Sequence, residues 1–525
     1  MMSLPRLSVF TLLFSFVLGH VGISQAQDQA YKTLPLDSRY DIPDLRDYRP
    51  DDPELVKVRA EISQKRSTLN GMLGRLKSVL EDRGGMTPQE VNTFLRDYYF
   101  ASMTQTTPRK LGEYGNLRNE FFRALATARG PQRLQILTFT LDTMKEIASD
   151  NFHPAARVNA LIIIGKLDSQ RGTSGSNAQA PIPFAPALDF LLGMVERDDT
   201  ADYLKTAAMS GIMRHAELRP LGSRNELEPG LRNRISALSL KLLQTGANQD
   251  SNAGQYWLRR QAAQAMGNLR DAGNGSANAK ELLNILRNRD EKIMLRIDAI
   301  EAISKMSNLD PSSLDIFEIV LAISDFVVEA AKADANYLDE TYRQIAEVAS
   351  FLDNEDVKTG SARKTKSKKD AGLSGPAGTG DERPGAGQQM SAEDNPEVVP
   401  VFRRQAVLQR VKTIIYYAGQ ILGSRTDENR LVRQVARVKG ENSEEHAFVL
   451  SLAQKCTEMM VSTNVIETPF TSKKKRSEEA ESPDVRTRAE KLRDVLLANA
   501  DEIEAMLNNI RKKDGNSNDE TGSGD

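Results

Sequence analysis

Histidine is the side chain used most often for acid–base catalysis and metal binding near neutral pH, and this chain of 525 residues has four. His20 lies near the N-terminus, and His153, His215 and His446 are far apart in sequence. None of these three precedes Glu or stands at metal-ligand spacing from another histidine. His153 precedes Pro154, which is typical of a turn that opens a helix. His215 is expected at a helix end, where its positive charge would favour the helix dipole.

Cys456 is the only cysteine, so the chain cannot form an intramolecular disulfide. It lies in the apolar-patterned stretch from Ala447 to Val461, which predicts a buried side chain. An intermolecular disulfide or a reactive thiol is the alternative. A catalytic thiol needs a neighbouring base that lowers its pKa, and His446 is ten residues away in sequence.

Other catalytic signatures are missing from the sequence. The glycines of Gly273-Asn-Gly275 and Gly378-Thr-Gly380 lie in polar stretches that follow no strand, unlike a nucleotide-binding loop. Ser361 and Lys364 match Ser-x-x-Lys by letter only, in a stretch too polar to build a fixed oxyanion hole. We predict no catalytic residues, no metal site and no cofactor, and therefore a protein that is not an enzyme.

The charge balance also excludes one class of partner. The chain has 70 basic and 72 acidic residues, so no net field attracts nucleic acid. Two basic runs, Arg363–Lys369 and Lys473–Arg476, could make weak contacts with anionic polymers or a membrane surface.

The N-terminus has the pattern of a signal peptide. A positive start, Met1–Arg6, precedes the apolar run Leu7–Leu18, which is too short to span a bilayer as a helix. Small residues follow, and they predict cleavage between Ala26 and Gln27. We expect an exported protein, periplasmic or extracellular, with no transmembrane span after cleavage.

Four segments share one pattern: a basic residue, an alanine three positions later and an apolar residue four positions beyond. They are Arg157–Ile164, Lys205–Ile212, Arg259–Met266 and Arg296–Ile303. Their basic residues are 48, 54 and 37 positions apart, within the range of helical repeats. Alanine permits close approach of neighbouring helices, and in three segments Gly or Ser follows the basic residue by eight positions. An apolar helix is predicted before each segment, so the helices form pairs that bury their apolar faces on the next pair.

This pattern resembles the HEAT family of the HEAT/armadillo superfamily, over about residues 131–310. The resemblance implies a ladder between an acidic turn residue and a basic residue six positions later in the second helix. Asp199 with Lys205 and Asp290 with Arg296 have this spacing. The remaining candidate ladder residues, with other spacings or beyond the repeat region, are Arg157, Arg259, Glu397 and Arg403. Some family members carry a di-iron site on His-Glu pairs, which this chain lacks, and others are chromophore lyases.

The expected fold class is all-α, an α-solenoid of HEAT-like helix pairs with flanking amphipathic helices and disordered linkers. The heptad pattern of Leu55–Leu80 and the apolar stripe of Val485–Ile510 mark the flanking helices. The predicted segments are a signal peptide (1–26), an extended arm (27–53), an N-terminal helical segment (54–130), the repeat domain (131–352), a disordered linker (353–397), further repeats (398–463), a charged linker (464–484), an amphipathic helix (485–512) and a disordered tail (513–525).

The sequence predicts a non-enzymatic scaffold for an unknown protein partner, because helical repeats present long binding surfaces. Two alternatives stay open. One is an envelope or membrane-surface structural protein held by the basic linkers. The other is an enzyme or cofactor-handling protein of the lyase type on a HEAT scaffold.

Overall fold

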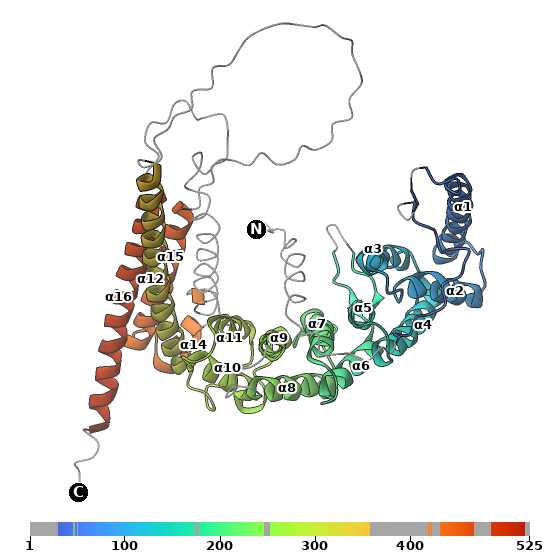
Figure 1. Ribbon diagram of the computed structural model, residues 1–525. Coiled ribbons are helices and arrows are strands. Elements are labelled where there is room, and N and C mark those ends of the chain that lie inside the picture. Colours follow the sequence, from blue (N-terminus) through green and yellow to red (C-terminus); the bar gives the residue numbers. More distant parts are fainter. Residues whose placement is uncertain are drawn as a thin grey trace. The chain divides into compact units, whose positions relative to one another are not determined.

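The computed structural model describes residues 30–45, 48–49, 51–173, 178–245, 253–356, 418–419, 422, 431–466 and 485–519. Over these residues the protein is all-α, as expected, with fifteen α-helices and one short antiparallel pair of strands (Figure 1). The chain divides into two units, residues 1–211 and residues 212–525, and each is described by itself. We refer to them as unit 1 and unit 2.

Several predicted features lie outside the described residues. They are the signal peptide with Ala26 and Gln27, both basic runs, the ladder candidates Glu397 and Arg403, and most of the predicted linkers.

Unit 1 consists of helices, one π-helical segment and two short strands. In chain order these are α1 (Leu55–Leu80), α2 (Pro88–Phe94), η3 (Leu95–Phe100), α3 (Pro108–Leu125), α4 (Gly130–Ser149), α5 (Pro154–Gly165), β1 (Asp168–Gln170), β2 (Ile182–Pro183) and α6 (Ala185–Glu196). Helix α7 (Asp202–Leu218) runs across the boundary into unit 2. The two strands are antiparallel, and Asp168 pairs with Pro183.

Three helices of unit 1 begin with a side-chain cap followed by proline. Thr87 caps α2 in a reciprocal capping box with Glu90, and Thr107 caps α3. His153 caps α5, where its Nδ1 accepts a hydrogen bond from the backbone N–H of Ala155 (3.2 Å). The predicted turn at His153 is therefore confirmed. Each cap satisfies a backbone N–H that the first helical turn leaves without a partner.

The arm before α1 packs onto unit 1. The backbone N–H of Leu34 donates to Thr104 Oγ1 (2.9 Å), and both residues are buried. Farther along, the buried ring of Tyr40 meets Phe94 edge-on, with centroids 5.3 Å apart. Helix α1 contacts α3 and α4 through one stripe, so its heptad pattern serves packing within unit 1.

Unit 2 contains four helices in two pairs, followed by three long helices and one short helix. In chain order they are α8 (Pro229–Gln244), α9 (Ala253–Leu269), η4 (Asn274–Ser276), α10 (Ala277–Arg287), α11 (Ile293–Lys305), α12 (Ile316–Asp356), α14 (Leu431–Lys439), α15 (Glu444–Ile466) and α16 (Val485–Asp519). Helix α8 packs on α9 and α10 on α11, while α9 also contacts α11 and α8 also contacts α10 (Figure 1). First helices thus lie beside first helices, and second helices beside second helices.

Small residues permit the closest helix crossings. A Cβ added to Gly267 in α9 would lie 2.6 Å from the Cα of Ala302 in α11. In unit 1, a Cβ added to Gly165 in α5 would lie 2.7 Å from the Cα of Gly211 in α7. In both crossings a glycine eight positions after the basic residue meets a small residue six positions after the next one. The small residues of the pattern are therefore required by backbone contact.

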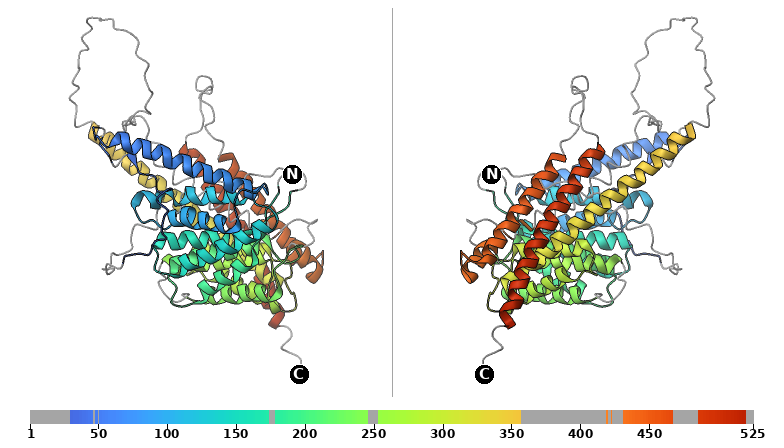
Figure 2. Two further views of the ribbon diagram at one scale, coloured as in Figure 1. Left: turned by 90° about the vertical axis from the view of Figure 1, so that its right-hand side faces the viewer. Right: turned by 90° about the vertical axis from the view of Figure 1, so that its left-hand side faces the viewer.

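The C-terminal helices of unit 2 pack along one another. Helices α12 and α16 lie side by side (Figure 2). They run antiparallel, because Arg511 pairs with Asp325 while Arg493 pairs with Asp339. The stripe that α16 buries comprises Leu492, Leu496, Ala500, Ile503 and Leu507. Helix α12 continues to Asp356 and α16 to Asp519, so both helices extend into stretches expected to be disordered.

Candidate functional site

Each arginine of the repeat pattern caps the C-terminus of the helix that precedes its own. Arg157, Arg259 and Arg296 each donate from Nε to a backbone carbonyl in the last turn of the preceding helix. The acceptors are Ala148 (2.9 Å), Leu243 (3.0 Å) and Leu286 (2.9 Å), each the second-to-last residue of its helix. Such carbonyls have no partner within the helix, so the arginine satisfies them.

Two of these arginines also bind a glutamate farther along the chain. Arg259 donates through both terminal nitrogens to Glu291, with Nη1 2.8 Å from Oε2. Arg296 binds Glu329 of α12 in the same bidentate manner, at 2.7 and 3.0 Å. The side chains of Arg259 and Glu291 are almost fully buried, at 5% and 8% exposed. Each pair joins one helix pair to the following element.

The acidic partners predicted from six-residue spacing are therefore wrong. Arg296 does not pair with Asp290, whose backbone N–H donates to Asn288 instead. Asp199 pairs with Arg197 at 3.4 Å and not with Lys205. For Arg296 the physical reason is that its Nε is held by the carbonyl of Leu286 in the preceding helix, which directs the terminal nitrogens toward Glu329.

A second arginine, Arg260, continues the polar network beside this ladder. Its Nε lies 2.5 Å from Oδ2 of Asp298, and Gln264 donates to Oδ1 of the same carboxylate (2.8 Å). Burial raises the pKa of Asp298, although Arg260 opposes that shift. Burial is the largest single influence on Arg260 and would lower its pKa, but the hydrogen bond to Asp298 and the nearby negative charges together raise it. The network fixes the Arg260 side chain on α9 against α11.

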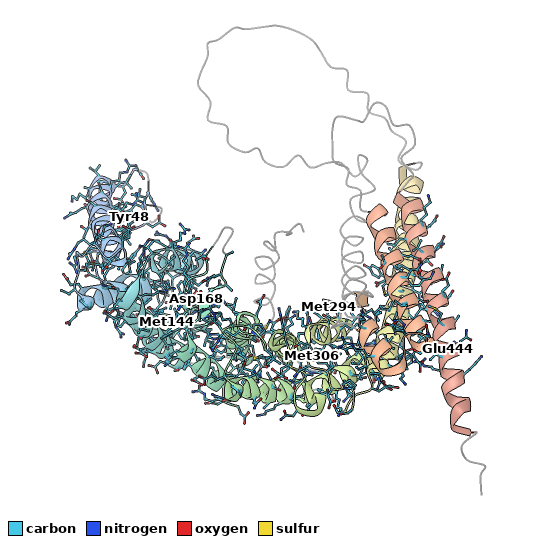
Figure 3. All side chains as sticks on the ribbon, turned by 180° about the vertical axis from the view of Figure 1, so that it is seen from behind. Tyr48, Met144, Asp168, Met294, Met306 and Glu444 are labelled. Atoms are coloured by element: carbon cyan, nitrogen blue, oxygen red, sulfur yellow. The ribbon has the colours of Figure 1, made fainter. Side chains whose placement is uncertain are left out.

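Aromatic side chains flank this fixed arginine. The Arg260 guanidinium lies 5.0 Å from the ring centroid of Trp257, the only tryptophan in the chain. The Lys292 ammonium lies 4.6 Å from the ring centroid of Tyr256. Both rings are partly exposed, and Met294, labelled at the start of α11 in Figure 3, is 37% exposed. We call Tyr256, Trp257, Arg260, Lys292 and Met294 the second-helix patch.

The second-helix patch contains four residue types that are common at protein interfaces. Tryptophan, tyrosine, arginine and methionine are enriched at protein interfaces, and the first three dominate binding hot spots. The patch is built on helices that are held by the Gly267–Ala302 crossing and by the ladder pair of Arg259. Side chains on such elements lose little freedom when a partner binds.

The three described histidines and Cys456 occupy a helix cap or buried positions. His215 does lie in the last turn of α7, but it is fully buried and neither ring nitrogen has a hydrogen-bond partner. Burial lowers its pKa to about 3, so it is neutral, and the expected charge interaction with the helix dipole is wrong. Cys456 is buried as predicted, and burial raises its pKa to about 12, which excludes a thiolate at neutral pH. His446 contacts the carbonyl of Glu441 near the start of α15.

The described residues contain no group of three or more His, Cys, Asp or Glu side chains placed to hold a metal ion. Within the same part of the chain, every helix is either too short or too polar to cross a bilayer.

The ladder glutamates and the second-helix patch were missed by the sequence analysis. Glu291 and Glu329 follow their arginines by 32 and 33 residues, so no local spacing indicates the pairing. One sequence signal could have indicated the patch: the sole tryptophan stands two positions before Arg259-Arg260.

Comparison with known proteins adds no relative: no protein-family model matches the chain, and a search of curated proteins gave no significant match.

Proposed function

We propose that this protein is an exported, non-enzymatic interaction scaffold, built as a HEAT-like α-solenoid, and that the second-helix patch binds its protein partner. The observation that carries the proposal is the placement of Trp257 and Tyr256, both partly exposed, under the cations of Arg260 and Lys292. These cations and rings give a partner both apolar area and hydrogen-bond donors.

The packing of unit 2 supports a solenoid of HEAT-like pairs. Second helices α9 and α11 contact each other through Gly267 and Ala302, and first helices α8 and α10 contact each other as well. The ladder joins each pair to the next through Arg259 and Arg296. Repeated pairs that contact only their neighbours present one continuous layer of second helices for binding.

A surface variant tests the patch without disturbing the core. Met294→Asp places a charge in the patch at an exposed side chain, and Val438→Asp on α14 is the matched control at a side chain 53% exposed. The mature chain, residues 27–525, serves as bait in the envelope or secreted fraction of its source. We expect quantitative mass spectrometry to show a protein that the wild type and Val438→Asp enrich and that Met294→Asp loses by about tenfold.

Equal enrichment of every captured protein by the two variants contradicts the assignment of the patch. Circular dichroism of both variants establishes that each remains folded.

Export is tested separately, since the cleavage site lies outside the described residues. N-terminal sequencing of the protein purified from its source should begin at Gln27. A chain that retains residues 1–26 contradicts this part of the proposal.

A further inference from the structure

Unit 1 contains a cleft of about 430 Å³ that the repeat pattern does not involve. Its walls come from the arm, α1, α2 and the π-helical segment η3. The volume lies in the range of small-ligand pockets, about 300–1,000 Å³. π-Helical segments occur frequently at functional sites, and η3 contributes Asp97 to this cleft.

Both arginines that line the cleft already have carboxylate partners. Arg39 contacts both carboxylate oxygens of Asp37, at 3.0 Å and 3.1 Å from Nε, and this contact lowers the pKa of Asp37. Arg75 donates to Glu90 (3.2 Å) and to the carbonyl of Gly85. The cleft therefore has no free cation among its described side chains.

Asp97 is the carboxylate without a partner. Its backbone carbonyl accepts a hydrogen bond from the N–H of Asp37 (3.1 Å), but its side chain pairs with no described residue. Burial and the nearby charge of Asp37 raise the pKa of Asp97, while Arg96 and Arg39 act in the opposite direction. With Asp37, Glu90 and Asp97 against two arginines, the described side chains of the cleft carry one excess negative charge.

Aromatic rings complete the chemistry of the cleft. Tyr40 and Phe94 both line it, and the guanidinium of Arg39 lies 5.4 Å from the ring centroid of Tyr40. The ring of Tyr40 thus already contacts one guanidinium, that of Arg39. A planar cation that forks to a carboxylate beside these buried rings is the ligand that suits the cleft.

We propose that this cleft binds the guanidinium group of an arginine side chain presented by a protein partner, with Asp97 as its carboxylate and Tyr40 and Phe94 as its apolar wall. The ion pair satisfies the unpaired carboxylate, and the rings replace water around the cation. This inference does not depend on the second-helix patch, because every residue involved belongs to unit 1.

The test uses the full mature chain and blocked pentapeptides with one variable residue, Gly-Gly-X-Gly-Gly. Arginine and citrulline at X have nearly the same shape and differ in charge. We expect saturation-transfer NMR titrations to show the arginine peptide binding at least about tenfold more tightly than the citrulline peptide. Equal affinities overturn the proposal, whatever the variants show.

Two variants assign binding to the cleft. Asp97→Asn should reduce affinity for the arginine peptide by about tenfold, whereas Asp142→Asn, at an exposed aspartate of α4, should leave it unchanged. Thr93→Arg places a competing guanidinium at an exposed position in the cleft and should also abolish binding. Full binding by folded Thr93→Arg and Asp97→Asn proteins places the arginine site elsewhere and refutes the inference.

Discussion

Gly267 of α9 faces Ala302 of α11 so closely that a glycine Cβ would lie 2.6 Å from the Cα of Ala302 and 3.0 Å from its Cβ. Real Cβ atoms do not approach a backbone atom this closely, so a larger residue must separate the two second helices. A single methyl group added at this crossing should therefore lower the stability of the folded protein.

Gly267→Ala should destabilise the protein although alanine is the better helix former. Helix propensity favours alanine by about 1 kcal/mol, whereas overpacking of a tight contact costs about 1–3 kcal/mol. Because the contact is with backbone, we expect a net loss, measured as a lower urea midpoint. Gly71→Ala in α1 is the control, since a Cβ there meets nothing within 4 Å, and it should raise the midpoint. An increase in both variants contradicts the crossing.

The pair Arg259–Glu291 should be costly to break from one side. Arg259→Met leaves Glu291 buried without its partner, which destabilises by about 3–5 kcal/mol. The double change Arg259→Met and Glu291→Met removes the unpaired charge and should recover much of that loss in urea unfolding. Lys145→Met, at an exposed pair with Asp142, should cost less than about 1 kcal/mol. If the double variant is no more stable than Arg259→Met, the pair is not coupled.

The repeat pattern predicted the positions of contact better than the identity of the partners. The glycine at Gly267 could be interpreted from the sequence because close helix approach demands a small residue at a fixed helical spacing. Glu291 could not be assigned as the partner of Arg259, because the two residues are 32 positions apart. The conformation of the chain between them determines which acidic side chain contacts the arginine. Asp97 was equally hidden, since its cleft depends on contact with Asp37 of the arm, 60 residues earlier. The burial of His215 was also missed, because its position in the last turn of a helix does not reveal which neighbouring elements cover it.

His215 should make the protein less stable at acidic pH. Its pKa is about 3 in the folded protein and 6.5 as the ordinary value, so the unfolded chain binds the proton first. Stability is therefore complete above about pH 6.5 and falls as the pH drops toward 3, by about 2 kcal/mol at pH 5 from this group. Urea midpoints measured at pH 7 and pH 5 report the change.

His215→Leu provides the matched comparison, because leucine fills the buried site without a titratable group. The difference between the two pH values should shrink by the contribution of His215. An unchanged difference in the leucine variant shows that other groups cause the acid sensitivity.

Trp257 offers a direct optical probe of the second-helix patch, since no other tryptophan contributes to the emission. Arg260 and Lys292 place positive charge beside the indole, so iodide should quench more strongly relative to caesium than it does with free N-acetyltryptophanamide. Arg260→Gln removes the charge nearest the indole and should reduce this preference for iodide. Arg511→Gln on α16 changes the same residue type at a pair with Asp325 and should have no effect. A wild-type ratio of iodide to caesium quenching that equals the ratio for free N-acetyltryptophanamide means that the indole does not lie within the cationic patch.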